Sequence, residues 1–199
     1  MPNATENGKR SAATKILHWS AALAIITQLG LSLVMQSPNR NRPGDSFFEI
    51  HEKVGIVAAV ILIVFWIWSI ARSGETRLVA FFPWLSPKQL RLVAADAKRV
   101  FAPLERGQET RPFASAVHGL GLIIATLMAF SGLLGYFVAS ARSLLEVHET
   151  VAPLMWAYLV GHVAISIVHE LRGERIIGPM LSMTKKGRSK LGVKELDGS

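Results

Sequence analysis

Four long stretches of this sequence contain no Asp, Glu, Lys or Arg, and no other feature restricts its fold as strongly. Each is long enough to cross the hydrocarbon core of a bilayer as a helix, which takes about 17–25 residues. Ordinary amphipathic helices mix polar and apolar residues in every turn, whereas here the 22 Lys and Arg lie almost entirely between the stretches. We therefore expect an all-α integral membrane protein, a four-transmembrane-helix bundle rather than four buried helices of a soluble one. The uncharged stretches are Ile16–Met35, Val54–Ala71, Phe113–Ala141 and Thr150–Val168.

With their flanks, the stretches predict one membrane domain over residues 15–183, between an N-terminal arm (1–14) and a solvated, flexible tail (184–199). The basic N-terminus resembles a secretory signal, but its apolar run is longer than an ordinary signal core and lacks a small-residue cleavage site. We expect this run to be retained as the first span. The four spans, numbered along the chain, are predicted at about residues 15–36, 51–71, 112–140 and 148–171.

The basic residues predict the orientation of the spans. Most Lys and Arg lie in the N-terminal arm, in the segment between spans two and three, and in the tail, while the two remaining loops are short and carry few. Loops rich in Lys and Arg stay on the cytoplasmic side of the membrane. Both termini and the central segment are therefore expected to be cytoplasmic.

A cytoplasmic amphipathic helix is expected between spans two and three. Ser86-Pro87 is a typical helix start, because a hydroxyl caps the helix and proline fits its first position. Such a helix with a basic face usually lies in the headgroup plane, and a docking surface for a soluble partner is the alternative. Apolar residues recur at helical spacing, namely Leu90, Val93, Ala94, Ala97, Val100, Phe101 and Leu104, and basic ones fill the other side, namely Lys88, Arg91, Lys98 and Arg99.

The chain contains no cysteine, which limits its metal chemistry. Disulfides, iron–sulfur clusters and covalently attached c-type haem are all excluded. Any metal ligands must therefore be histidines or carboxylates.

All six histidines lie in the four spans or within about a turn of them: His18, His51, His118, His148, His162 and His169. Ionisable residues at membrane depth are costly and usually functional. On span four, His148 and His162 are 14 residues apart, which places them within about 40° of one helix face and roughly 21 Å apart along the axis. Two ligands on one stripe, one near each membrane surface, suit two haems stacked through the bilayer.

Each haem then needs a second ligand at matching depth on another span. His51 and His148 both lie just before an apolar run at the outer surface, so they match well. His18 lies near the cytoplasmic end of span one, and its partner on span four is less clear. His162 and His169 share one face, and depth alone favours His169. The residues leave this choice open.

Three segments of the sequence resemble the prokaryotic cytochrome b561 family, which includes the b-type cytochrome subunits of membrane hydrogenases and formate dehydrogenases. The resemblance covers about residues 10–185, nearly the whole chain. The segments are Leu17-His18-Trp19 in span one, Ile50-His51-Glu52-Lys53-Val54-Gly55 opening span two, and His148-Glu149-Thr150 followed by Gly161-His162 in span four.

The resemblance implies a four-helix bundle with two haem b (heme b) groups, each held by two histidines. It pairs His18 with His162 at the inner haem and His51 with His148 at the outer haem. His118 matches a family histidine that is not an axial ligand. His118 and His169 remain as candidates for a quinone or proton site, because histidine donates a hydrogen bond and exchanges a proton near neutral pH.

We therefore expect a cytochrome of the bacterial inner membrane that carries electrons between a periplasmic redox partner and the quinone pool. The partner would be a soluble redox protein or a dehydrogenase or hydrogenase subunit; lipid surrounds the chain, and no nucleic acid is involved. Whether the chain is an enzyme in its own right stays open, because the alternative is a self-standing superoxide:quinone oxidoreductase. The loop between spans three and four is shorter than in family members that react with superoxide, which disfavours that activity. A His-lined metal or proton transporter is disfavoured too, because the four uncharged stretches contain no Asp or Glu.

Overall fold

The computed structural model describes residues 11–72, 81–98, 112–171 and 177–181. Within these ranges the chain is helical and forms no β-strand, only an isolated bridge between Asn39 and Arg42. The α-helices are α1 (Ala12–Ser32), α2 (Ser46–Ala71), α3 (Pro87–Ala97), α4 (Pro112–Phe137), α5 (Leu144–Leu171) and α6 (Ile177–Leu181), and two short 3₁₀ turns are η2 (Pro83–Leu85) and η3 (Ala139–Ala141).

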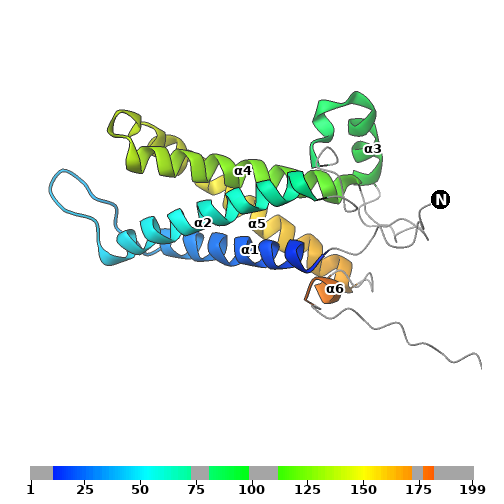
Figure 1. Ribbon diagram of the computed structural model, residues 1–199, viewed down its shortest axis with the longest axis horizontal. Helices are drawn as coiled ribbons and strands as arrows, with labels where there is room; N and C mark the ends of the chain where they lie inside the picture. Colours follow the sequence, from blue (N-terminus) through cyan, green and yellow to red (C-terminus); the bar gives the residue numbers. More distant parts are fainter. Residues whose placement is uncertain (1–10, 73–80, 99–111, 172–176, 182–199) are drawn as a thin grey trace, which may run out of the picture.

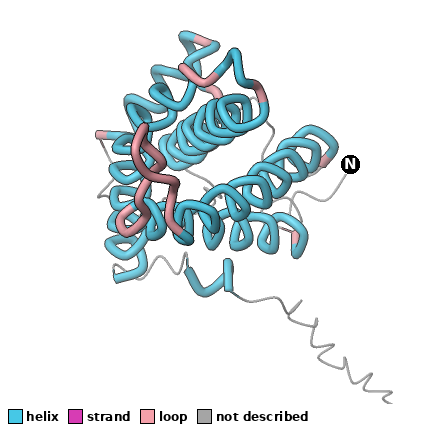
Figure 2. The backbone as a smooth tube through the Cα atoms, turned by 90° about the vertical axis from the view of Figure 1, so that its left-hand side faces the viewer, coloured by secondary structure: helices cyan, strands magenta, loops and turns pink. Residues whose placement is uncertain are grey.

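The four long helices α1, α2, α4 and α5 lie lengthwise along one another (Figure 1). α1 packs against α2, α2 against α4, and α4 against α5. One end of the bundle carries the α1–α2 loop and the α4–α5 turn, and we call it the loop end. The other end carries α3 and α6, and we call it the α3 end. Figure 2 views the bundle from the loop end.

Three of these helices, α2, α4 and α5, are long and apolar enough to cross a membrane. This confirms the all-α membrane character of the chain. The predicted first span corresponds to α1, which ends at Ser32 and is not among the three. Polar residues such as Lys15, His18 and Gln28 interrupt its apolar sequence, so its composition is less distinctly that of a membrane helix than the sequence analysis assumed.

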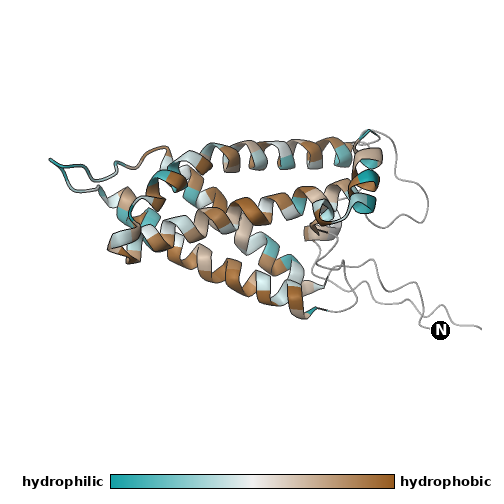
Figure 3. Ribbon diagram, turned by 90° about the horizontal axis from the view of Figure 1, so that it is seen from above, coloured by the Kyte–Doolittle hydropathy of each residue, from teal (hydrophilic) through white to brown (hydrophobic). Residues whose placement is uncertain are grey.

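Apolar side chains cover much of the outside of the bundle. Leu23 and Ile70 are each 68% exposed, and brown segments recur along the long helices in Figure 3, whereas the α1–α2 loop is largely teal. Extended apolar surface of this kind is rare on soluble monomers, and a bilayer would cover it. Among the described residues, Leu29, Ile124, Val151 and Met155 form a buried hydrophobic cluster.

The helix starts follow from local capping. The Ser11 hydroxyl accepts a hydrogen bond from the backbone N–H of Thr14 at 3.2 Å, and Asp45 Oδ1 accepts one from Phe48 at 2.9 Å. Side-chain caps satisfy backbone donors that the first helical turn leaves without partners. Asp45 explains why α2 begins at Ser46, before the predicted start at residue 51.

The helix predicted between spans two and three is present as α3. Pro87 occupies its first turn, but the Ser86 hydroxyl makes no capping hydrogen bond, so that detail of the prediction is wrong. Asp96 near the end of α3 accepts a hydrogen bond from the backbone N–H of Phe113 at 3.0 Å and so joins α3 to the start of α4. The continuation of the apolar pattern to Leu104, residues 1–10 of the N-terminal arm and the tail beyond residue 181 lie outside the described residues. The last residues of the predicted arm belong to α1, which begins at Ala12.

Candidate functional site

The described histidines gather at both ends of the bundle. His51 on α2 and His148 on α5 lie towards the loop end, and we call them the loop-end pair. His18 on α1, His118 on α4 and His162 on α5 lie towards the α3 end, and we call them the α3-end cluster. All five side chains are partly buried. Packing of different helices, rather than neighbouring positions in the sequence, brings each group together.

In the loop-end pair, the ring centroids of His51 and His148 are 6.2 Å apart and the ring planes lie at 86°. His148 Nδ1 donates to the Met128 carbonyl at 2.9 Å, and the buried Ser131 hydroxyl is 3.4 Å from the same nitrogen. Ser131 itself donates to the Leu127 carbonyl at 2.7 Å. A carbonyl can only accept, so Nδ1 of His148 carries the proton and Nε2 keeps its lone pair.

The other member of the loop-end pair is held differently. Gln28 Nε2 on α1 donates to the backbone carbonyl of His51 at 2.9 Å. His51 Nδ1 is buried and has no hydrogen-bond partner within the described part of the chain, and the same is true of Gln28 Oε1. The backbone of His51 is therefore hydrogen-bonded to α1, while Nδ1 of its ring has no hydrogen-bond partner among the described residues.

In the α3-end cluster, the ring centroid of His18 is 6.3 Å from that of His162 and 6.2 Å from that of His118. The rings of His118 and His162 are closer to each other, at 5.0 Å. His118 Nδ1 donates to the Ala114 carbonyl at 2.7 Å. The ring of Tyr158 stacks on that of His162, with centroids 5.6 Å apart and planes at 13°. This end thus gathers three imidazoles and one phenol.

His169, the rival partner for His18 on sequence grounds, is buried on α5 with 7% of its surface exposed. It lies seven residues after His162 on the same helix. The contact at 6.3 Å places the ring of His162 beside His18, in line with the pairing that the family resemblance implies.

The arrangement of these side chains suits a cofactor that takes only two protein ligands. Among the described residues, no group of three or more His, Asp or Glu side chains is placed to hold a bare metal ion. Two imidazoles bound to opposite sides of one metal, each through a bond of about 2 Å, have ring centroids about 6 Å apart. The His51–His148 and His18–His162 separations of 6.2 and 6.3 Å match that spacing.

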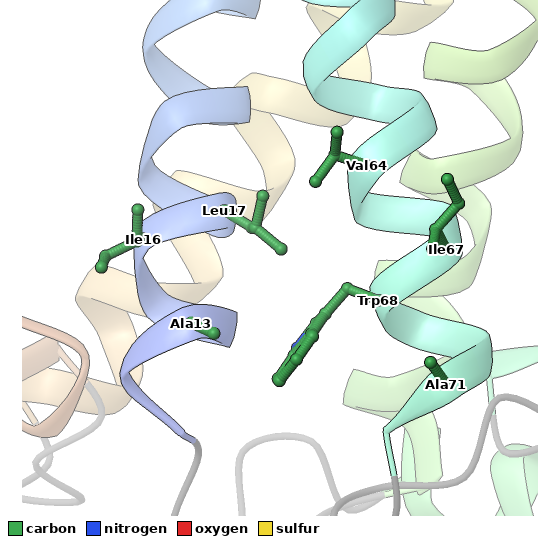
Figure 4. Close-up of a pocket in the computed structure, with 7 residues that line it drawn as sticks. All are labelled: Ala13, Ile16, Leu17, Val64, Ile67, Trp68 and Ala71. Atoms are coloured by element: carbon green, nitrogen blue, oxygen red, sulfur yellow. The ribbon is translucent and has the colours of Figure 1, made fainter.

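A separate apolar groove of about 400 Å³ lies between α1 and α2, towards the α3 end (Figure 4). The indole of Trp68 extends between the two helices there, and its Nε1 donates to the Thr14 hydroxyl at 2.9 Å. The remaining lining side chains are aliphatic, among them Ile16, Leu17 and Val64. The groove offers apolar contact and no group that could ligate a metal.

Sequence reasoning identified the histidines but not the residues that contact them from other helices. Tyr158, Gln28 and the Met128 carbonyl carry no sequence signal, because their contacts depend on how the helices pack. Gly132 on α4 also contacts a histidine of another helix, since a Cβ at this position would lie 3.0 Å from His148 Nδ1 on α5.

Comparisons with known proteins identify the family of this chain. The family model described as prokaryotic cytochrome b561 matches residues 9–183. Searches against curated proteins and against solved structures each returned no match. Because the family model spans most of the chain, this protein belongs to the prokaryotic cytochrome b561 family.

Proposed function

We propose that this membrane b-type cytochrome holds two haems and carries electrons across the bilayer between a periplasmic redox partner and the quinone pool. The observation that supports the proposal best is the pair of matched spacings, 6.2 Å for His51–His148 and 6.3 Å for His18–His162. Each equals the separation of about 6 Å expected for two imidazoles on one iron. A family of b-type cytochromes makes haem the cofactor to expect.

The proposed ligands are His51 and His148 for one haem and His18 and His162 for the other. α5 supplies one ligand to each, and its two histidines are roughly 21 Å apart along the helix axis. His118 is as near His18, at 6.2 Å, as His162 is, at 6.3 Å, so this spacing excludes only a pair of His118 with His162, whose rings are 5.0 Å apart. We keep His118 outside the ligand set because it matches a family histidine that is not an axial ligand.

Haem iron bound by two histidines changes oxidation state by one electron and has no open position for oxygen. The chain's own groups fix the ligands for this task. The Met128 carbonyl holds the Nδ1 proton of His148, which would leave the lone pair of Nε2 available to a haem iron. At the other end, the stacked ring of Tyr158 restricts the orientation of His162.

The relay crosses the membrane only if α1 is a fourth span, and its position supports this. α1 packs along α2 and carries exposed apolar side chains such as Leu23 and Ile26. The distribution of Lys and Arg favours a bacterial inner membrane with the loop end in the periplasm and α3 in the cytoplasm. In that orientation His51 and His148 hold the outer haem, and His18 and His162 hold the inner one.

We place quinone chemistry at the α3 end, with His118 as the first candidate group and His169 as the second. His118 is partly exposed, and its ring lies 5.0 Å from that of the proposed ligand His162. Quinone reduction takes up protons as well as electrons, and an imidazole beside the haem suits both hydrogen bonding and proton exchange. His169 is 7% exposed and so less accessible to a quinone from the lipid.

The ligand assignment is tested by replacing each histidine and counting haem in the purified full-length protein. His51→Ala and His148→Ala should each remove the same haem, and His18→Ala and His162→Ala should each remove the other. A redox titration followed in the visible spectrum identifies which haem remains. If His162→Ala keeps both haems while His169→Ala loses one, the inner pairing is wrong.

The quinone assignment is tested by steady-state quinone reduction in His118→Ala and His169→Ala, after both haems have been shown to be retained. A fall in turnover with an unchanged spectrum supports an inner quinone site. Wild-type turnover in both variants would place quinone at the loop end, beside His51 and His148.

A further inference from the structure

Gln28 is a partly buried polar residue near the C-terminal end of α1, and only the nitrogen of its side-chain amide has a hydrogen-bond partner among the described residues. Nε2 donates to the His51 carbonyl at 2.9 Å. A carbonyl cannot donate, so the nitrogen must face it and the oxygen must point elsewhere. That oxygen, Oε1, is buried and has no hydrogen-bond partner within the described ranges.

His51 has the complementary deficiency. Its Nδ1 is also buried without a partner in the same part of the chain. An imidazole that ligates a metal through Nε2 carries its proton on Nδ1, which then needs an acceptor. An unpaired acceptor on Gln28 and an unpaired donor on His51 therefore belong to two residues already joined by a hydrogen bond, from the Gln28 side chain to the His51 backbone carbonyl.

His148, the other histidine of the loop-end pair, has hydrogen-bond partners at its Nδ1. His148 Nδ1 has the Met128 carbonyl at 2.9 Å and the Ser131 hydroxyl at 3.4 Å. Several hydroxyl groups in the long helices are likewise satisfied, for example Thr126 by the Leu122 carbonyl at 2.6 Å and Ser166 by the His162 carbonyl at 2.7 Å, whereas the buried Ser69 hydroxyl on α2 has no partner within the described residues. Buried polar groups normally have partners, so the two unpaired atoms at His51 and Gln28 require an explanation.

Gly55 leaves room for the Gln28 amide at this position. A Cβ on residue 55 would lie 2.7 Å from Gln28 Nε2, closer than non-bonded atoms tolerate. Residue 55 is one turn after His51 on α2. The missing side chain at Gly55 and the amide at Gln28 thus fit each other across the α1–α2 contact.

We infer that Gln28 is a positioning residue for the loop-end haem: its Oε1 accepts the Nδ1 proton of His51 when His51 ligates the iron. The inference rests on the proposed assignment of His51 and His148 as haem ligands. Accepting this proton makes the imidazole a stronger electron donor to the iron. Stronger donation stabilises the oxidised haem, so Gln28 lowers the reduction potential of the loop-end haem and leaves that of the other haem unchanged.

The test is a redox titration of the purified full-length holoprotein, in which each haem is followed by its visible spectrum and its low-spin EPR signal. Gln28→Met removes the acceptor while keeping the length of the side chain, and it should raise the potential of the loop-end haem alone. Gln28→Glu keeps an acceptor oxygen and should hold that potential at or below the wild-type value. Gly55→Ala, which displaces the amide of an intact Gln28, should shift the potential in the same direction as Gln28→Met.

The matched control is Thr27→Val, which removes a polar group from the exposed neighbouring position on α1. It should shift neither potential. If Gln28 had a purely structural role, Gln28→Met and Gln28→Glu would shift the reduction potential of the loop-end haem in the same direction. That result overturns the inference, and so does an unchanged potential of the loop-end haem in Gln28→Met. His148→Ala belongs in the same series. If His148→Ala retains the loop-end haem, the ligand assignment is wrong and the inference is wrong with it. If His148→Ala loses that haem while Gln28→Met leaves its reduction potential unchanged, only the role of Gln28 is wrong.

Discussion

At the loop end two imidazoles face each other across α2 and α5, whereas at the α3 end three imidazoles and the ring of Tyr158 gather from α1, α4 and α5. At the loop end, Nδ1 of His148 donates to a backbone carbonyl, and the backbone carbonyl of His51 accepts from the amide of Gln28. The α3 end instead has an additional imidazole, His118, beside the proposed ligands. Under the proposed function, the loop end transfers electrons alone and the α3 end transfers electrons together with protons.

The largest expected difference between the two ends is in haem content, when His118 at the α3 end and His148 at the loop end are each replaced by alanine. His118→Ala should retain both haems, because His18 and His162 still face each other at 6.3 Å. His148→Ala, by contrast, should lose the loop-end haem completely, because the loop-end pair contains no third imidazole. Haem content per chain, measured on both variants, checks the difference. Loss of a haem in His118→Ala would make His118 a ligand and remove the distinction between the two ends.

A smaller effect is expected from filling the space beside Tyr158. A Cβ at Gly121 would overlap the Tyr158 ring, and overpacking of this kind costs about 1–3 kcal/mol. Gly121→Ala should therefore destabilise the bundle and shift the spectrum of the α3-end haem, because Tyr158 stacks on His162. Gly161→Ala is the matched control, since nothing lies within 4 Å of a Cβ at that position. Thermal unfolding of Gly121→Ala and Gly161→Ala measures their stabilities, and equal stabilities would refute the packing role of Tyr158.

At the loop end the equivalent substitution should act more weakly. A Cβ at Gly132 would lie 3.0 Å from His148 Nδ1 and 3.1 Å from its Cε1, so the ring has to move by only a few tenths of an ångström. We expect Gly132→Ala to keep the loop-end haem but to shift its reduction potential, with the other haem unaffected. A redox titration measures both potentials at once. Equal shifts at the two haems would mean that the substitution disturbs the whole bundle rather than His148.

The smallest expected effect is the pH dependence of the start of α2, which positions His51. Hydrogen bonds from the backbone N–H of Phe48, then of Gln36, and the positive charge of Arg42 hold the pKa of Asp45 below its usual value. A carboxyl with a lowered pKa in the folded state stabilises the fold above its unfolded pKa, and this stabilisation is lost as the pH falls through the folded pKa. Asp45→Asn keeps a capping oxygen without the titration, so its stability should fall less than that of the wild type on acidification below about pH 4. Thermal unfolding across that range compares the two, and parallel curves would contradict the role of Asp45.

Much of the fold followed from the sequence, because the signals involved are local. The uncharged stretches located the long helices, and Pro87 marked the start of α3. α1 was harder to classify, because Lys15, His18 and Gln28 dilute its apolar character. α6 was not predicted, since its five residues have too little pattern to stand out.

The candidate site was only partly predictable, and the reason is geometric. Helical periodicity placed His148 and His162 on one stripe, but His169 shares that stripe, so periodicity could not choose between His162 and His169. The choice depends on the tilt and depth of α5 relative to α1, which only packing sets. Gln28 and Tyr158 escaped notice for the same reason, because their contacts cross from one helix to another.

The central claim, that two histidine pairs hold two haems, is tested most directly by counting non-covalent haem per chain. Pyridine haemochrome absorbance of the purified wild-type protein, divided by the protein concentration from amino-acid analysis, should give about two haem b per chain. Acidified acetone should extract all of this haem, because the chain has no cysteine to attach it. A ratio of about one would mean that one of the two pairs does not bind haem, and a ratio near zero would contradict the account of this protein as a di-haem electron carrier.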